Sequence, residues 1–554
     1  MTPPTIFRAF RPSASAVAAA LITATACAAP DVPPSAPPVD VLSPDTPVAV
    51  TGGEIRGAVS AIDSGVLAFM GVPFAAAPVG EGRWQPPAPV SPWEGVRDAT
   101  APGPVCRQGG PQEQSEDCLF LNVWAQREMT EPRPVMVWIH GGGFVTGSGS
   151  DAMTDGTRLA SRGAVVVTLN YRLGAFGFMA HPALSAESPH DASGNYGLLD
   201  IVAALEWVRD NASAFGGDPN RVTIFGESAG AGAVMSVMVM PQSRGLFHRA
   251  IAESIFINGW DRRLREPFGG LTSAEDQGRA VGDALGVSAD DPLTALRAAT
   301  PDEVFEAVGA AGFAGLGWAP VVDGWALPDD PVQMFADGRQ HQVPLIAGIN
   351  GNEGSLMTQA IPMDDVAAFE TFVHATYPAV ADDALAHYGV TTDADARPGI
   401  DHLFHDMWFV GPLRALATPH ARAAPVWTYH FTPVPPTQMG AGLGSHHAAE
   451  IPYVFGNLVD RATLPEGSTP HPMMAGDWTE ADRAISDAMM DHWVQLAASG
   501  DPNREGLAEW PRFDDTDRHL TFGDPIETGS ALHTAGFDLY VVHETARRGA
   551  PLPR

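Results

Sequence analysis

Short apolar runs alternate with longer helix-like segments through the middle of the chain. Each run is five to eight residues long, as expected of strands, and a helical pattern covers 197–215. Strands that alternate with helices favour a mainly parallel sheet with helices on both of its faces. The pattern therefore predicts an α/β fold built on one large sheet. The strand-like runs are 134–140 (PVMVWIH), 164–171 (AVVVTLNY), 221–225 (RVTIF), 343–350 (VPLIAGIN) and 424–431 (APVWTYHF).

Two long stretches of helical character, 270–310 and 362–425, lie between and around the later runs. We expect them to form a cap over the carboxyl edge of the sheet. No second long linker and no internal repeat interrupts residues 51–554. Length alone suggests three or four domains, but large α/β domains often exceed that guide. We therefore predict a single domain from residue 51 to residue 554.

The first 50 residues have a different character. Arg8 and Arg11 precede an apolar, small-residue stretch at 14–26, which is too short to span a membrane but suits a secretory signal. Cys27 follows directly, and ATAC resembles a bacterial lipobox, in which the cysteine is lipidated; ordinary cleavage within ACAAP is the alternative. We expect residues 1–27 to be a signal peptide, and the Pro/Ala-rich residues 28–50 to be a semi-rigid linker. The protein would then be exported, either secreted, periplasmic or lipid-anchored to the cell envelope.

The composition is strongly acidic. The formal net charge is -33, and all 32 basic residues are arginines. A nucleic-acid partner requires a cationic face, so this balance argues against nucleic-acid binding and against electrostatic adsorption to anionic lipid. Membrane association is therefore expected only through a lipid anchor at Cys27. The hydrophobic content of 45% is ample for a large buried core.

A serine stands between two glycines at the junction of a strand and a helix, in RVTIFGESAG. A Gly-x-Ser-x-Gly turn in this context forces Ser228 into a strained conformation, and Gly226 and Gly230 leave room where a Cβ would clash. A serine hydroxyl becomes an effective nucleophile when a base removes its proton. The turn therefore indicates a candidate nucleophile. A tight turn with an incidental hydroxyl is the alternative.

A glycine-rich loop follows the strand-like run at 134–140. His140 is followed by Gly141, Gly142 and Gly143. Three glycines allow the backbone to turn its N–H groups toward a developing oxyanion. A phosphate-binding loop would need a GxGxxG register or a Lys-Ser/Thr ending, and neither is present. An oxyanion-binding loop is the interpretation that the downstream serine turn favours.

These motifs and several others, in the same order along the chain, resemble the type-B carboxylesterase family of α/β-hydrolases, which includes the cholinesterases. The similarity covers about Ile55 to Tyr540. It implies a central, mostly parallel, twisted sheet flanked by helices, with helical cap insertions and a serine hydrolase site that needs no cofactor and no metal. The segments that carry it include GVPFAAAPVGEGRWQPPAPV, SEDCLFLNVW, NYRLGAFGF, GNYGLLD, APVVDGWALP and EIPYVFG.

The resemblance implies a Ser–Glu–His triad in that chain order, with Ser228 as its first member. The family's acid lies in a turn after a strand, and GINGNEGSLM offers Glu353 at that point. The family's histidine stands three residues before an acidic residue, so His447, with Glu450, matches the pattern and His446 does not. A His-His-Glu metal site is the alternative at this position, but the pattern is not HExxH.

The chain has three cysteines. In an oxidising compartment Cys106 and Cys118 are expected to form a disulfide. The resemblance agrees, because the family's first bridge ends in an EDCL segment that matches Cys118. In cholinesterases the bridged loop is much longer and carries the tryptophan that binds the choline cation. A choline ester is therefore not expected as the main substrate.

The resemblance also bears on the substrate pocket. Positions at which acetylcholinesterases narrow the acyl pocket with phenylalanine correspond to Ala314 and Leu316, and later aromatic positions become Leu356 and Met357. Smaller and aliphatic walls imply a roomier apolar pocket. Core packing is an adequate alternative account of Leu356 and Met357.

One departure from the family pattern lies close to the triad acid. The family usually has Gln-Ser-Gly where this chain has Glu253-Ser254-Ile255. In relatives this serine lies next to the triad residues and does not take part in the reaction itself. Loss of the glycine is expected to alter local packing near Glu353.

The sequence therefore predicts a carboxylic ester hydrolase that works through an acyl-serine on a small-molecule ester. His447 would take the proton of Ser228, and Glu353 would hold the imidazole. The oxyanion would be bound by the N–H groups of Gly142, Gly143 and Ala229. Two alternatives remain on the same fold: a catalytically silent adhesion module, and a hydrolase of carbamates, lactones or amides.

Overall fold

The computed structural model describes residues 42–552 except 258–260, 289 and 466. All of these residues belong to one unit, which begins at Val39. The predicted signal peptide and Cys27 lie outside the described residues, as does most of the predicted linker. Residues 42–50, which the composition assigns to that linker, are part of the fold, because the buried Val48 pairs with Ile55 in a small sheet.

An eleven-stranded sheet forms the centre of this unit, as the alternating pattern predicts. Its seven central strands, from β17 to β10, run parallel to one another, and the flanking strands are antiparallel. In spatial order the strands are β18 (Glu527–Gly529), β17 (His519–Phe522), β14 (Val426–Phe431), β13 (Leu345–Asn350), β12 (Arg249–Glu253), β11 (Gly217–Glu227), β9 (Arg133–Ile139), β10 (Val165–Leu169), β8 (Phe120–Gln126), β4 (Val66–Pro73) and β3 (Ala58–Val59).

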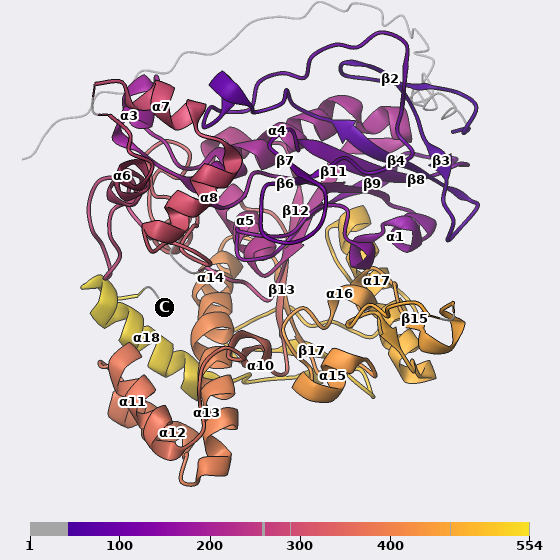
Figure 1. Cartoon of the computed structure of the whole chain (residues 1–554). Helices are drawn as coiled ribbons and strands as arrows, with labels where there is room; N and C mark the ends of the chain where they lie inside the picture. Colours follow the sequence, from indigo (N-terminus) through magenta and orange to yellow (C-terminus); the bar gives the residue numbers. More distant parts are fainter. Residues whose placement is uncertain (1–41, 258–260, 289, 466, 553–554) are drawn as a thin grey trace, which may run out of the picture. The chain divides into compact units, whose positions relative to one another are not determined.

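Both faces of the sheet are covered, which is why its strands read as continuous apolar runs. Along β9, Val135, Val137 and Ile139 face one hydrophobic core, whereas Met136 and Trp138 face the other. The first core includes α4 (Tyr196–Asn211) and α5 (Ala229–Val237), and the second includes α1 (Thr157–Ser161) and α17 (Glu480–Ser499). In Figure 1, α4 and α17 accordingly lie on opposite sides of β9 and β11.

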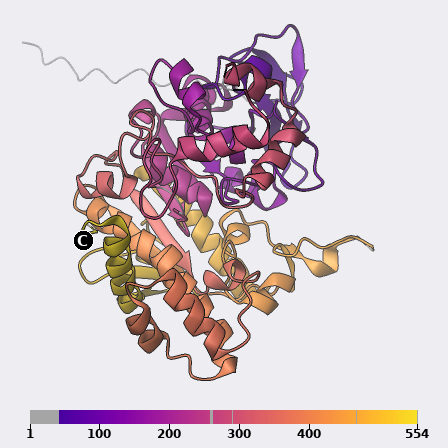
Figure 2. The ribbon, with the colours of Figure 1, turned by 60° about the vertical axis from the view of Figure 1, so that its left-hand side comes forward.

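The two stretches expected to be helical are helical. The first holds α6 (Ala274–Ala284), α7 (Pro292–Ala298) and α8 (Pro301–Ala310), and α8 begins with a capping box between Thr300 and Glu303. The second holds α11 (Val366–Thr376), α12 (Ala381–Tyr388), α13 (Asp393–His405), a π-helical turn η5 (Asp406–Val410) and α14 (Gly411–Ala421). The last helix, α18 (Thr534–Arg548), packs against α14 and η5, and Figure 2 shows these helices gathered together.

The remaining β-strands and α-helices of the described residues are short, and they sit in the connections. They are β1 (Val48–Val50), β2 (Gly53–Arg56), β5 (Val96–Asp98), β6 (Val105–Cys106), β7 (Gln114–Ser115), α2 (Gly174–Phe178), α3 (Pro182–Glu187), α9 (Pro331–Ala336), α10 (Gly354–Met357), α15 (Gln438–Leu443), α16 (Ile451–Val454), β15 (Val459–Asp460) and β16 (Ala475–Gly476). One connection carries the disulfide between Cys106 and Cys118, as predicted. None of the helices in the described part of the chain is both long enough and apolar enough to cross a bilayer.

Candidate active site

Ser228 lies in a sharp turn between β11 and α5. Its backbone has φ 58° and ψ −123°, a strained conformation for a residue with a side chain. The flanking glycines are needed at this turn: a Cβ on Gly226 would lie 2.5 Å from the carbonyl oxygen of Ile139, and a Cβ on Gly230 would lie 2.1 Å from the same oxygen. The structural reason predicted for the two glycines is therefore confirmed.

His447 and Glu353 lie together behind this turn. Nδ1 of His447 is 2.7 Å from Oε2 of Glu353, and both side chains are buried. The other oxygen of Glu353 accepts hydrogen bonds from the Asn350 N–H and the Ser254 hydroxyl, each at 2.6 Å. Glu353 is therefore held in place from two sides while it fixes the orientation of the imidazole. His446, by contrast, has its Nδ1 2.7 Å from the backbone carbonyl of His447.

The other ring nitrogen of His447 faces an acid that sequence reasoning did not assign to the site. Nε2 lies 3.1 Å from Oε1 of Glu227, the residue immediately before Ser228. Among the described residues Nε2 forms no hydrogen bond, so none joins it to the Ser228 hydroxyl. Ser228 and His447 nevertheless line the same cavity. Catalytic hydrogen bonds often tighten only when substrate binds.

The electrostatics of His447 are set by its acidic neighbours. Burial disfavours the charged imidazolium, but Glu227 and Glu353 outweigh this effect and raise the pKa of His447 to about 9. Burial also raises the pKa of the Glu227 carboxyl, next to the imidazole. The pair therefore retains a proton to higher pH than an isolated histidine and glutamate would.

The glycine loop lies next to the serine turn. Gly142 and Gly143 have φ values of 101° and 63°, so both occupy the region that favours glycine. Neither of their N–H groups, nor that of Ala229 at the start of α5, donates a hydrogen bond to another described residue. Gly141 is equally constrained, because a Cβ there would come within 3.1 Å of the Ser228 Cβ. Three main-chain donors near the serine are thus available to a ligand.

His140 anchors this loop through contacts of its ring and its carbonyl. Its Nδ1 lies 2.9 Å from the Gly141 carbonyl, and its ring stacks on Tyr171 at 4.4 Å. The Tyr171 hydroxyl donates a hydrogen bond to the His140 carbonyl at 2.9 Å. Burial lowers the pKa of His140 to about 4, so the ring is neutral over most of the pH range.

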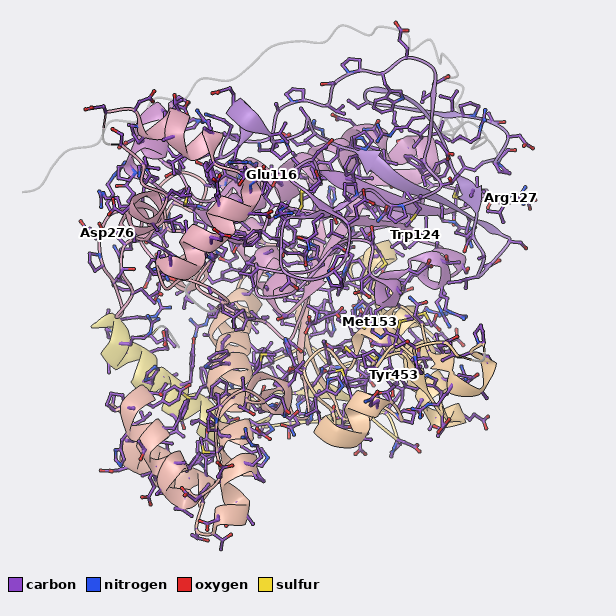
Figure 3. All side chains as sticks on the ribbon, in the orientation of Figure 1. Glu116, Trp124, Arg127, Met153, Asp276 and Tyr453 are labelled. Carbon is purple, nitrogen blue, oxygen red and sulfur yellow. A yellow bond between two sulfur atoms is a disulfide. The ribbon has the colours of Figure 1, made fainter. Side chains whose placement is uncertain are left out.

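The cavity above Ser228 has a volume of about 410 Å³ and is largely apolar. Leu316, Leu356 and Met357 line it as predicted, whereas Ala314 is not among its lining residues. No arginine of the described segments contributes to the wall, and its acidic members are Asp151 and Glu227. The other large apolar side chains are Trp138, Val145, Met153 (labelled in Figure 3), Phe256 and Ile451.

One cluster away from the cavity has residue types that bind metals. Ligand atoms of His405, Asp406 and His533 lie within 4.8 Å of one another. Nδ1 of His405, however, accepts a hydrogen bond from the Glu353 N–H at 3.3 Å. A neutral imidazole that accepts at Nδ1 carries its hydrogen on Nε2, so His405 has no free lone pair for a metal. This histidine instead contacts the backbone of the acid that orients His447.

Comparison with known proteins agrees with this geometry. Residues 44–537 match the model of the carboxylesterase family. The chain is 37% identical over 492 residues to fumonisin B1 esterase of Sphingopyxis macrogoltabida, covering 86% of this chain and 87% of that protein. It is 36% identical over 497 residues to para-nitrobenzyl esterase of Bacillus subtilis (strain 168), covering 85% and 93%.

Solved structures give the same result. A structure of PNB esterase superposes with a TM-score of 0.73 and 32% identity, covering 89% of this chain and 99% of that one. A thermophilic PNB esterase gives a TM-score of 0.74 at 30% identity. The family model spans nearly all of the described residues, and its range contains the serine turn, the glycine loop and the buried His–Glu pair. The chain therefore belongs to the carboxylesterase family and is an α/β-hydrolase that cleaves carboxylic esters.

Proposed function

We propose that this esterase works through Ser228 as nucleophile, His447 as general base and then acid, and Glu353 as the residue that orients His447. The observation that carries the proposal is the 2.7 Å contact between His447 Nδ1 and Glu353 Oε2, placed behind a strained serine in an apolar cavity. In this scheme the Ser228 hydroxyl attacks the ester carbonyl while His447 takes its proton. His447 then protonates the leaving alcohol, and water hydrolyses the acyl-serine.

The oxyanion formed in each step needs hydrogen-bond donors. We infer that the N–H groups of Gly142, Gly143 and Ala229 supply them. Gly142 and Gly143 have positive φ values, and Ala229 is the first residue of α5. None of the three N–H groups donates a hydrogen bond to another described residue, which supports this role. Loss of one such donor typically costs about 2.7–4 kcal/mol of transition-state stabilisation.

The decisive experiment is a set of single variants assayed with p-nitrophenyl butyrate. Ser228→Ala is expected to abolish turnover while circular dichroism and melting temperature stay close to wild type. His447→Ala should be far less active than His446→Ala, because the His446 ring is hydrogen-bonded to the His447 carbonyl and not to Glu353. Retained turnover in Ser228→Ala, or the reverse ranking of the histidines, would refute the assignment.

We infer that the preferred substrates are esters with an uncharged, apolar acyl group. The apolar cavity wall supports this. The charged lining supports it too, because no arginine of the described segments lines the cavity and Asp151 would repel an anionic acyl chain. A panel of p-nitrophenyl esters of rising chain length, with hemisuccinate esters as the anionic controls, tests the inference. Faster hydrolysis of the anionic esters would contradict it. Carbamates, lactones and amides belong in the same panel.

We also propose that the protein is exported, with residues 1–27 as the signal and Cys27 as a lipid attachment site, followed by a tether that ends before Leu42. The charged and apolar pattern of residues 8–26 supports export, and so does the Cys106–Cys118 disulfide, which suits an oxidising compartment. Mass spectrometry of the mature N-terminus distinguishes a lipidated Cys27 from cleavage within ACAAP.

A further inference from the structure

Four glutamate side chains form a buried cluster beside His447, and the scheme above gives a role to Glu353 alone. They stand at the ends of β11 and β12, after β13 and before α16, and none is more than 3% exposed. A single imidazole cannot neutralise four carboxylates, and like charges in a dry interior repel strongly. The group must therefore hold protons of its own. The four are Glu227, Glu253, Glu353 and Glu450.

Hydrogen bonds show which carboxyl groups favour the ionised form. Glu353 accepts from a backbone N–H and a hydroxyl and contacts His447. Glu450 accepts from the Asn350 amide, and its Oε1 lies 3.2 Å from the Ser254 hydroxyl. Several donors around a carboxylate stabilise its negative charge. These two groups therefore have donors that stabilise an ionised form, although burial and the neighbouring Glu353 raise the pKa of Glu450 to about 7.

Glu253 is placed differently. Its Oε1 accepts one hydrogen bond, from the indole N–H of Trp493 in α17 at 2.7 Å. Its Oε2 is buried and has no partner among the described residues. The nearby Tyr429 hydroxyl, on β14, is likewise buried and without one. Burial, reinforced by Glu450 and Glu227, raises the pKa of Glu253 well above its usual range. An unpartnered buried oxygen costs least when the carboxyl is neutral.

We propose that Glu253 is a positioning residue, held as a neutral carboxylic acid within the carboxylate cluster behind His447, where it accepts the hydrogen bond from Trp493 without adding a charge. Its backbone is already part of the serine turn, because the Ser228 N–H donates to the Glu253 carbonyl at 2.9 Å. The same residue thus fixes the serine turn through its carbonyl and limits the negative charge behind the imidazole through its side chain. The inference rests on the proposed roles of Ser228 and His447 for its catalytic consequence.

The consequence concerns the charge that His447 experiences. An ionised Glu253 would add negative charge to a cluster that already holds His447 in its protonated form. The imidazole would then act as a base only at still higher pH. The titratable groups facing Glu253 from the packed elements are Glu227 of β11, Tyr429 of β14 and Glu450 before α16.

Glu253→Gln tests the proposal, because glutamine has the same shape and is always neutral. Its carbonyl oxygen can still accept the hydrogen bond from the Trp493 indole. We expect kcat and KM within about twofold of wild type near neutral pH. Glu253→Leu, which leaves the Trp493 indole N–H without its acceptor, should lose at least about tenfold in kcat with a smaller change in KM.

Infrared spectroscopy at neutral pH gives a readout that does not depend on turnover or on the leucine variant folding. The wild-type protein should show a carbonyl band of a protonated carboxylic acid that Glu253→Gln lacks. Glu306→Gln, at an exposed position of α8, should retain this band, and so should the Ser228→Ala variant.

The outcomes are separable. A band that is identical in wild type and Glu253→Gln would overturn the proposal, as would a loss of about tenfold or more in kcat for the glutamine variant. An active Ser228→Ala variant that retains the band would refute the assigned nucleophile and leave the protonation of Glu253 standing. A missing band in Glu253→Gln with near-normal turnover would support the neutral acid directly.

Discussion

Replacement of Glu227 by glutamine should move the pH dependence of ester hydrolysis. His447 acts as a base only when its imidazole is neutral, so activity rises as pH increases through its pKa. Glu227 Oε1 lies 3.1 Å from His447 Nε2, and it contributes more than any other group to holding the protonated form. Its removal should therefore lower the pKa of His447 and shift the acidic limb of kcat/KM to lower pH.

The size of the shift follows from the geometry. Two opposite charges 3.1 Å apart attract by about 5 kcal/mol at an effective dielectric constant of about 20. This is an upper bound, because burial keeps Glu227 itself partly protonated. The pKa of His447 is raised from 6.5 to about 9 by three acids together, in spite of burial. A displacement of at least about one pH unit, equivalent to about 1.4 kcal/mol, is expected for Glu227→Gln.

The assay is kcat/KM for p-nitrophenyl butyrate from about pH 5 to about pH 10 for wild type and variant. Asp151→Asn is the matched control, because Asp151 lines the same cavity but is exposed to solvent, where its charge is screened. Its acidic limb should move by less than about 0.3 pH units. An unmoved limb in Glu227→Gln, or a limb that moves to higher pH, would refute the electrostatic reasoning.

Three further predictions concern folding and stability. Gly230→Ala should abolish activity and lower the melting temperature, because the new Cβ would strike the Ile139 carbonyl oxygen. The control is Gly309→Ala in α8, where a Cβ meets no other atom, and it should leave both quantities unchanged. Cys118→Ser removes the disulfide with Cys106, which closes a loop with a sequence separation of 12, and should lower the free energy of unfolding, measured in urea, by about 3 kcal/mol. Chemical reduction of the wild-type protein should cause the same loss. Burial lowers the pKa values of His140 and His430 to about 4, so between about pH 6.5 and about pH 4 the unfolded chain binds protons at these residues that the folded chain does not. The melting temperature should therefore fall as pH drops through that range. A constant melting temperature there would contradict the prediction.

The backbone of the site was predictable because its requirements are local. A strand, a glycine-flanked serine and an Ala-rich helix occupy one continuous segment, which made the turn recognisable. The atom that a Cβ on Gly230 would strike, however, is the Ile139 carbonyl oxygen of β9, which only the fold brings close. His447 could be distinguished from His446 by its spacing to Glu450, although the two histidines are adjacent. The fold was predictable for a similar reason, since strands buried on both faces carry uninterrupted apolar runs.

Contacts between distant segments were not predictable in the same way. Glu227 was read as part of a turn, and only the folded structure brings it to within 3.1 Å of His447 Nε2. The state of Glu253 depends on Trp493, which lies 240 positions away in the chain. Ala314 was expected in the pocket wall from its register, yet Leu316 lines the cavity and Ala314 does not. The pairing of Val48 with Ile55 was also hidden by the Pro-rich composition before it.

The hydrogen bond from Trp493 to Glu253 has a consequence for biosynthesis. The serine turn lies in the first half of the chain. His447, Glu353 and Trp493, which surround it in the fold, come from the second half. A nascent polypeptide still attached to the ribosome, or one truncated ahead of α17, would carry the nucleophile without its surroundings. Hydrolytic competence would therefore appear late during maturation, after nearly the entire polypeptide has been synthesised and has collapsed around its centre.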